Sequence, residues 1–167
     1  EAVTDDGLAG GFDDTRADDA GAVYVLNSSN GRQRNVLTAT DGEFEDFFGL
    51  AVATDDTFIA VAAPFDDDLG ADSGSVYLFD AATGAFVRKI VPDDGAPGDQ
   101  FGIALDIADG RLAVGAWGAN GGAGAAYVFD LASGSQLDEL AASDAAPLDI
   151  LGRSVALSGS TVVAGAP

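Results

Sequence analysis

The stretch GSVYLFD at residues 74–80 decides the fold, because it returns twice more in nearly the same form. GAVYVLN stands at 21–27 and GAAYVFD at 124–130, so the copies are offset by 53 and then by 50 residues. β-Branched and aromatic residues fill each copy and a glycine opens it, which is typical of a strand that follows a turn. A tandem period near fifty residues predicts propeller blades or a solenoid.

Two further motifs repeat with the same offsets. Phe48-Gly49 returns as Phe101-Gly102 and, weakened, as Leu151-Gly152. AVAAP at 60–64 returns as AVGAW at 113–117 and as AGAP at 164–167. Because separate motifs keep one register, the chain is a tandem array of a single structural unit.

One complete unit contains four predicted strands, at 48–54, 58–63, 75–79 and 86–91. Small apolar residues fill the first two strands on both alternations, so both faces of these strands should be buried, whereas the last two carry larger and more polar residues. No stretch keeps a helical period over ten residues, and we expect no helix. The predicted fold is all-β, with three four-stranded antiparallel repeats as the blades of a β-propeller.

The phase of the repeats divides the chain into two half blades and two complete blades. The half blades are 1–46, with the third and fourth strands, and 150–167, with the first and second; the complete blades are 47–99 and 100–149. Propellers close with about 4–8 blades, so this array should be open or completed from elsewhere. Either another copy adds its hairpin by strand addition and forms a ring or a filament, or further blades of a longer chain complete it.

These residues resemble FG-GAP repeats, the blade units of the integrin α-subunit propeller and of secreted bacterial and archaeal proteins. The resemblance is carried by Phe48-Gly49, by Ala62-Ala63-Pro64 and by 74–79, and it continues through the later copies. It implies a propeller located outside the cell or at its surface, which binds an extracellular protein or glycan rather than catalysing a reaction. We therefore expect a non-catalytic module for adhesion or surface architecture, stabilised by calcium.

Two alternative functions stay open from the sequence. The chain is a self-assembling structural subunit, or it is a fragment of a propeller enzyme such as a polysaccharide lyase.

Composition argues against several chemistries. Without His or Cys there is no Ser-His-Asp triad, cysteine nucleophile or His-ligated zinc site. Seven basic against 28 acidic residues, a net charge of −21, disfavour nucleic acid, and no apolar run approaches the ~18 residues of a membrane span.

Two acidic loops are candidate calcium sites, because Ca²⁺ takes about 6–8 oxygen ligands from carboxylates, carbonyls and water. The segment 12–21 aligns on 65–74 at the offset of 53 residues, whereas the third copy is shorter and has no carboxylate. The integrin-type motif Asp-x-Asp-x-Asp-Gly-x-x-Asp is absent from the sequence. A solvated acidic surface is the alternative interpretation. The candidate ligands are Asp66, Asp67, Asp68 and Asp72, and Asp13, Asp14, Asp18 and Asp19.

A second acidic series recurs between the fourth strand of one unit and the first strand of the next. A periodic aspartate before a strand most often accepts hydrogen bonds from the backbone of its own turn, so we assign these residues a structural role. They are Asp41, Asp94 and Asp144, and Asp46, Asp99 and Asp149.

Overall fold

The computed structural model describes residues 20–167, which form twelve β-strands and one short helical turn. The strands make four antiparallel sheets, each in the order in which its strands follow along the chain. The first sheet pairs β1 (Val23–Leu26) with β2 (Gln33–Leu37), and the last pairs β11 (Ser154–Ser158) with β12 (Thr161–Gly165). Between them lie β3 (Val52–Thr54), β4 (Phe58–Ala63), β5 (Ser75–Asp80) and β6 (Phe86–Ile90), then β7 (Phe101–Ala108), β8 (Arg111–Ala116), β9 (Ala125–Asp130) and β10 (Gln136–Leu140).

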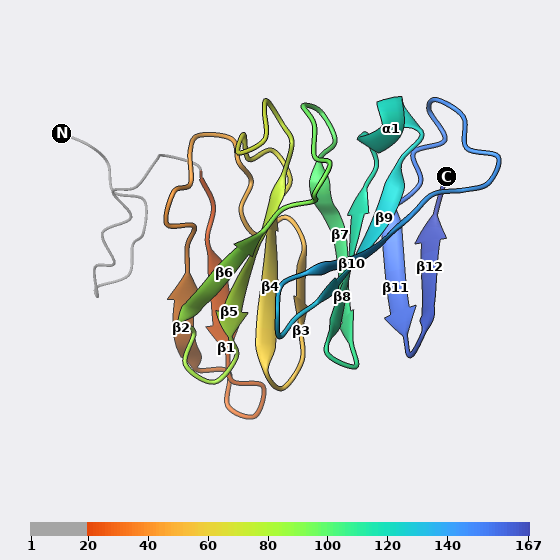
Figure 1. The fold of residues 1–167 in the computed structure, drawn as a ribbon. Helices are drawn as coiled ribbons and strands as arrows, with labels where there is room; N and C mark the ends of the chain where they lie inside the picture. The colour runs from red at the N-terminus through yellow and green to blue at the C-terminus, as the bar shows by residue number, and fades with distance from the viewer. Residues whose placement is uncertain (1–19) are drawn as a thin grey trace.

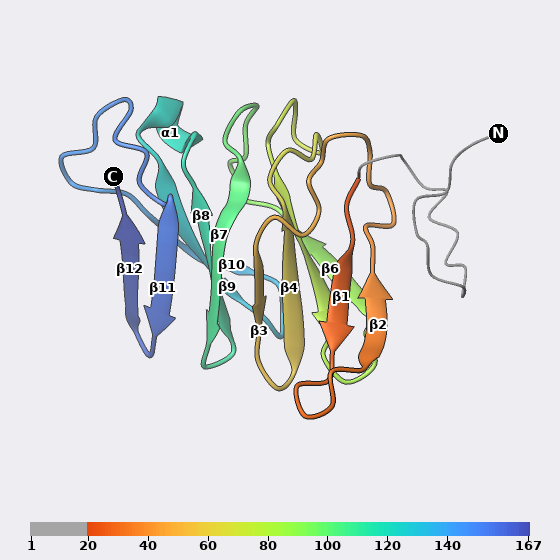
Figure 2. The same ribbon diagram turned by 180° about the vertical axis from the view of Figure 1, so that it is seen from behind.

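The four sheets stand side by side in an open row, and the two-stranded sheets occupy its opposite ends (Figures 1 and 2). The predicted all-β class with four-stranded, blade-like repeats is confirmed. The row does not close into a ring. We use "blade" for a four-stranded sheet and "half blade" for a two-stranded one.

The centre of each blade is its most buried part, because small residues allow neighbouring sheets to approach closely. From Ile59 to Ala63, β4 is buried, and β5 is buried from Ser75 to Phe79. The two strands pair with Val61 opposite Tyr77. One strand therefore contributes small side chains and the other contributes the aromatic rings that fill the gap between sheets.

Glycine is required where one sheet touches the next. Gly74 has a φ of +82°, and a Cβ at this position would overlap the carbonyl oxygen of Phe101 at the start of the next blade. The backbone N–H of Phe101 donates to the carbonyl of Ser73 over 3.0 Å. The same contact joins Gly21 to Phe48 and Gly124 to Leu151. The recurring glycine and the recurring Phe-Gly pair are thus the two sides of one junction, which is why they keep a common register.

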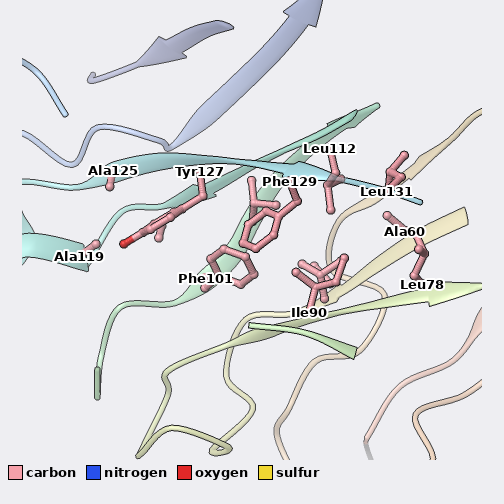
Figure 3. Close-up of a cluster of buried hydrophobic side chains, with 14 residues drawn as sticks. Ala60, Leu78, Ile90, Phe101, Leu112, Ala119, Ala125, Tyr127, Phe129 and Leu131 are labelled. Atoms are coloured by element: carbon pink, nitrogen blue, oxygen red, sulfur yellow. The ribbon is translucent and has the colours of Figure 1, made fainter. Parts of the chain in front are cut away.

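Aromatic rings from one blade pack on aliphatic side chains of the previous blade (Figure 3). Leu78 and Ile90 of the first blade belong to one buried cluster with Phe101, Tyr127 and Phe129 of the second. The ring centroids of Phe101 and Tyr127 lie 5.5 Å apart at 71°, an edge-to-face arrangement that adds about 1 kcal/mol to the burial of the rings. An equivalent cluster joins the first half blade to the first blade through Phe48, Tyr77 and Phe79.

Three local expectations were wrong. The first strand of the first blade is not buried on both faces, since Val52 and Thr54 are exposed. A helical turn, α1 (Ala119–Gly122), occupies the short loop of the third copy, although Asn120 and Gly121 have positive φ and the turn is irregular. The chain must reverse its direction within the few residues of this shorter loop, and the positive φ of the glycines allows the tight turn. In addition, the first strand of the first blade begins at Val52 rather than at residue 48, because the Leu50 N–H donates to the Phe47 carbonyl over 3.0 Å and closes a turn before the strand.

Candidate functional site

The longer loops of all sheets lie along one edge of the row, at the top of Figure 1, and we call this edge the loop end. The tight hairpin turns lie along the opposite edge, which we call the hairpin end. The loop end contains the segments 38–51, 64–74, 91–100, 117–124 and 141–153. It carries the described members of both acidic series that the sequence singled out, so it is the candidate functional surface of residues 20–167.

The centre of this surface is Lys89, the only lysine of the chain. Its Nζ lies 2.8 Å from Asp66, 2.5 Å from Asp68 and 3.1 Å from Asp41. The Tyr77 hydroxyl lies 2.8 Å from one oxygen of Asp41 and 2.8 Å from one of Asp66, so it can donate to either carboxylate. We call these five residues the Lys89 cluster.

Four separate segments bring the Lys89 cluster together. Tyr77 on β5 and Lys89 on β6 are direct cross-strand partners, so their side chains lie on the same face of the sheet. Asp66 and Asp68 come from the loop that follows β4, and Asp41 comes from the loop that follows β2 in the preceding half blade. The cluster therefore joins the half blade to the first blade by charge as well as by apolar packing.

Burial and charge shift the pKa values of the cluster in ways that favour the ion pairs. Burial disfavours the charged form of Lys89, but its hydrogen bonds to Asp66 and Asp68 outweigh burial and raise the pKa of the ammonium. Partial burial likewise opposes ionisation of Asp41, and bonds from Tyr77 and Lys89 outweigh it and lower the pKa of that carboxyl. Burial beside these carboxylates raises the pKa of Tyr77, which keeps its proton. The cluster thus places the Lys89 ammonium among the carboxyl groups of three aspartates.

The next junction has a different chemistry at the same repeat positions. Glu139 stands where Lys89 stands one repeat earlier, and it accepts a hydrogen bond from Asn120 Nδ2 over 3.1 Å. Burial, together with the nearby charges of Asp94 and Glu139, raises the pKa of Tyr127. Of the two junctions on either side of the first blade, only the earlier one has an ammonium among its carboxylates.

The four predicted calcium ligands of the first blade do not converge on one point. Asp66 and Asp68 face Lys89, whereas Asp67 accepts a hydrogen bond from the backbone N–H of Asp72 over 2.8 Å. Within residues 20–167, no group of three or more acidic side chains is arranged to hold a metal ion. Lys89 and the loop backbone therefore engage the carboxylates of Asp66, Asp67 and Asp68, and calcium binding by this loop stays a prediction. The other four, Asp13, Asp14, Asp18 and Asp19, lie outside the described residues.

Three members of the second acidic series bind backbone in their own turns. Asp46, Asp99 and Asp149 each accept a hydrogen bond from the N–H group three residues earlier, at distances of 2.6, 2.8 and 2.7 Å. Burial raises the pKa of Asp46 and Asp99, with a further contribution from neighbouring acids. Of the other three, Asp41 binds Tyr77 and Lys89, Asp94 lies beside Tyr127, and Asp144 is exposed.

The loop end also has a hollow of about 310 Å³ beside the Lys89 cluster. Six acidic residues line it: Asp41, Glu43, Asp46, Asp66, Asp67 and Asp68. The sequence did not indicate that Lys89 belongs to this site. A signal existed, because the only lysine falls in the strand that follows the strand of Tyr77, at a position that can oppose the tyrosine in an antiparallel hairpin.

Comparison with known families agrees with the repeated junctions. A model of the FG-GAP repeat matches three times, at residues 32–79, 85–129 and 135–167. The chain belongs to the FG-GAP repeat family. No curated protein matched the chain in a search by sequence.

Each matched FG-GAP unit crosses a boundary between sheets. The first match begins just before β2 and ends within β5, so it takes the fourth strand from one sheet and the first three strands from the next. The glycine junctions described above join successive matches, because Gly74 lies in the first match and Phe101 in the second, and Gly124 lies in the second and Leu151 in the third. The third match contains β10, β11 and β12, which are the fourth strand of one blade and the first and second strands of the last half blade.

Proposed function

We propose that this FG-GAP chain is a non-catalytic propeller module that acts outside the cell or at its surface, in adhesion or surface architecture. The observation that supports the proposal most directly is the acidic hollow at the loop end, which loops of the first half blade and of the first blade form beside the Lys89 cluster. A surface of this charge attracts basic segments of a protein partner and steers them to the loops. The described residues contain a single helix of four residues and no helix of the length and apolarity that a membrane span needs.

A binding experiment with matched charge changes tests the adhesion proposal. The chain is immobilised and exposed to a panel of basic extracellular proteins and of glycans at physiological ionic strength. Asp67→Asn removes one charge at the loop end, and Asp56→Asn removes one at the hairpin end. Binding that weakens several-fold with Asp67→Asn alone supports the loop end as the ligand surface. Equal affinities for both variants, or the absence of binding to every member of the panel, contradict the proposal.

Assembly is a second candidate function, and one observation favours it. The half blade at one end of the row has the first and second strands of a blade, and the half blade at the other end has the third and fourth. Images of the purified chain in the electron microscope distinguish this candidate, because an assembling subunit forms rings or filaments. Uniform small particles at all protein concentrations contradict it.

Stabilisation by calcium stays a prediction from the sequence. If calcium binds the acidic loops, calcium raises the melting temperature and a chelator lowers it, by mass action on the folded state. The comparison is made at constant ionic strength, because screening alone stabilises a chain of net charge −21. Lys89 competes for the carboxylates of the 66–72 loop, so Lys89→Met should enlarge the calcium effect if that loop is the site. A melting temperature that calcium leaves unchanged in both proteins contradicts the prediction.

A further inference from the structure

The two half blades expose residues that are buried in the complete blades. Tyr24 on β1 is 61% exposed and Leu26 is 58% exposed. Their counterparts on β5, one repeat later, are Tyr77, which is fully buried, and Phe79, which is 3% exposed. At the other end of the row, Val163 on β12 is 62% exposed. The exposed side chains therefore lie on the two strands that would be neighbours in a complete blade.

A hollow at the far end of the row lies beside β12, at the position that a third strand occupies in the complete blades. It has a volume of about 520 Å³, and one part of its lining is apolar and the other polar. The apolar part includes Val128, Leu140, Leu157 and Val162, and the polar part consists of Arg111, Asp138, Ser160 and Thr161. Val128 and Leu140 stand one repeat after Leu78 and Ile90, which pack on Phe129 in the preceding junction (Figure 3). Val128 and Leu140 are therefore the side chains on which a residue of the third strand would pack in the next junction, as Phe129 packs on Leu78 and Ile90.

A tyrosine–aspartate pair lies at the first two junctions, and the chain has one further tyrosine and one further aspartate at the same repeat positions. The hydroxyl of Tyr77 contacts Asp41, and Tyr127 lies beside Asp94. The aspartate in the next equivalent position is Asp144, which is exposed. The remaining tyrosine of the chain is Tyr24, which stands at the same repeat position as the other two.

We propose that a second copy of this chain completes the last half blade, with β1 of the second copy added antiparallel to β12. The pairings inside the two complete blades set the register, because Val61 faces Tyr77 and Val114 faces Tyr127. The equivalent residue on β12 is Ala164, so Ala164 faces Tyr24 of the second copy and Val162 faces its Leu26. Leu26 fills the hollow, and the Tyr24 hydroxyl reaches Asp144. This inference deepens the assembly candidate and does not depend on adhesion.

Charge is complementary at the outer part of the same interface. In the complete junctions a basic residue of the fourth strand reaches the hairpin turn of the next sheet: Arg34 Nη2 donates to Ala82, and the Arg88 guanidinium donates to Ala132 and Ser133. The counterpart of Arg88 in the second blade is Asp138, whose carboxylate cannot donate a hydrogen bond. The hairpin turn of the second copy carries Arg32 where the other turns carry Ala85 and Ser135. At this interface the positive charge lies on the hairpin turn, at Arg32, rather than on the fourth strand. Arg32 of one copy can therefore pair with Asp138 of the other.

Contacts of this kind are head-to-tail. They produce a ring when the rotation between successive copies brings the last copy back to the first, and a filament when it does not. Two copies contribute six blades to a closed ring, which is within the range of known propellers. The β-strand addition also satisfies the backbone groups along both open edges, which otherwise face solvent and invite non-specific pairing.

Light scattering after size-exclusion chromatography of the 167-residue chain gives the first test. We expect a mass of twice 16.6 kDa or a higher multiple. Leu26→Asp places a carboxylate against the apolar part of the hollow, at Val128 and Leu140, and should give monomers, whereas Leu148→Asp makes the same change at a site that is 82% exposed and should leave the mass unaltered. Circular dichroism establishes that both variants are folded. A folded monomer of the unmodified chain at ~100 µM, well above a micromolar dissociation constant, overturns the proposal.

Cysteine cross-linking tests the register without altering the apolar contacts of Leu26, and the chain has no other cysteine. The proposed pairing places Val25 of one copy opposite Val163 of the other. Oxidation of the double variant Val25→Cys/Val163→Cys should therefore give covalent oligomers, which are a dimer if two copies close a ring and a longer ladder if the copies form a filament. In the control Val25→Cys/Val162→Cys, the two side chains point to opposite faces of the composite sheet and no covalent oligomers should form. Covalent oligomers from both variants, or from neither, overturn the register, and neither result bears on whether the loop end binds a ligand.

Discussion

At the scale of single residues, the most consequential side chain is Lys89. It is 17% exposed and contacts Asp66, which is 4% exposed, so the pair is largely removed from water. Removing one partner of such a pair leaves the other charge buried and uncompensated, which costs more than the pair itself contributes. Lys89 is therefore the residue whose loss should destabilise the described part of the chain most by an electrostatic route.

We predict that Lys89→Met lowers the free energy of unfolding by about 3 kcal/mol, measured by urea denaturation at neutral pH. The double variant Lys89→Met/Asp66→Asn should recover a large part of the loss, because the neutral amide no longer needs a counter-charge. If the single variant is as stable as the unmodified chain, Lys89 does not hold the cluster together.

The pH dependence of stability should identify Asp46 as a carboxyl that is costly to ionise. Burial raises its pKa in the folded state, so its contribution to stability is greatest at low pH and falls as pH rises through that raised pKa. Asp46→Asn keeps an oxygen for the Glu43 N–H and removes the charge. We expect a higher urea midpoint than that of the unmodified chain at pH 7, and no such gain below the ordinary pKa of an aspartate. A uniform loss at both pH values contradicts this prediction.

At the scale of elements, the junction between sheets depends on glycine for two separable reasons. Gly74 has a φ of +82° and lies against the backbone of Phe101, whereas Gly98 has a φ of +84° with open space around it. The two positions therefore share the left-handed backbone and differ only in the contact with the next sheet. The pair offers a direct measurement of how much that close approach matters.

We predict that Gly98→Ala costs about 1–2 kcal/mol, the usual penalty of an L-residue in the left-handed region. Gly74→Ala should cost ~4 kcal/mol or more, since its Cβ displaces the carbonyl of Phe101 and separates the two blades. Urea denaturation of both variants gives the comparison, with circular dichroism in the absence of urea for a variant that does not fold. Equal costs would mean that the sheets can move apart without penalty.

At the scale of the whole molecule, the acidic surface opposes compaction. The net charge of −21 is spread over 167 residues, and the cluster around Lys89 neutralises only a small part of it. Repulsion between exposed carboxylates weakens as salt shortens the Debye length from about 10 Å at 0.1 M to about 3 Å at 1 M. The stability of the row of sheets should therefore depend on ionic strength more than that of a protein of balanced charge.

We predict that the melting temperature rises by several degrees between low salt and about 1 M NaCl, a range in which screening becomes nearly complete. A scan in KCl provides the control, because screening does not depend on which monovalent cation is present. A melting temperature that falls with salt would show that ion pairs such as the Lys89 cluster outweigh general repulsion.

The amino-acid sequence by itself determined the strands, their order and the phase of the repeats. These properties depend on local patterns, namely runs of β-branched and aromatic residues between turns, and on a register that every copy must keep to pack on its neighbour. The paired Phe-Gly and glycine motifs were visible for the same reason, because each junction repeats the contact between Gly74 and Phe101. Local patterning missed the turn at α1, where a shortened loop departs from the repeat.

Only the tertiary structure decided what the charged residues do. Asp41, Asp66 and Lys89 lie far apart in the sequence, and nothing in the spacing of the acidic loops shows that an ammonium stands among them. Equally, the exposure of Tyr24 and the hollow at Val128 became apparent only when the sheets were in place. Contacts between distant segments depend on how sheets stack and which strands remain without neighbours, and a one-dimensional period contains neither kind of information.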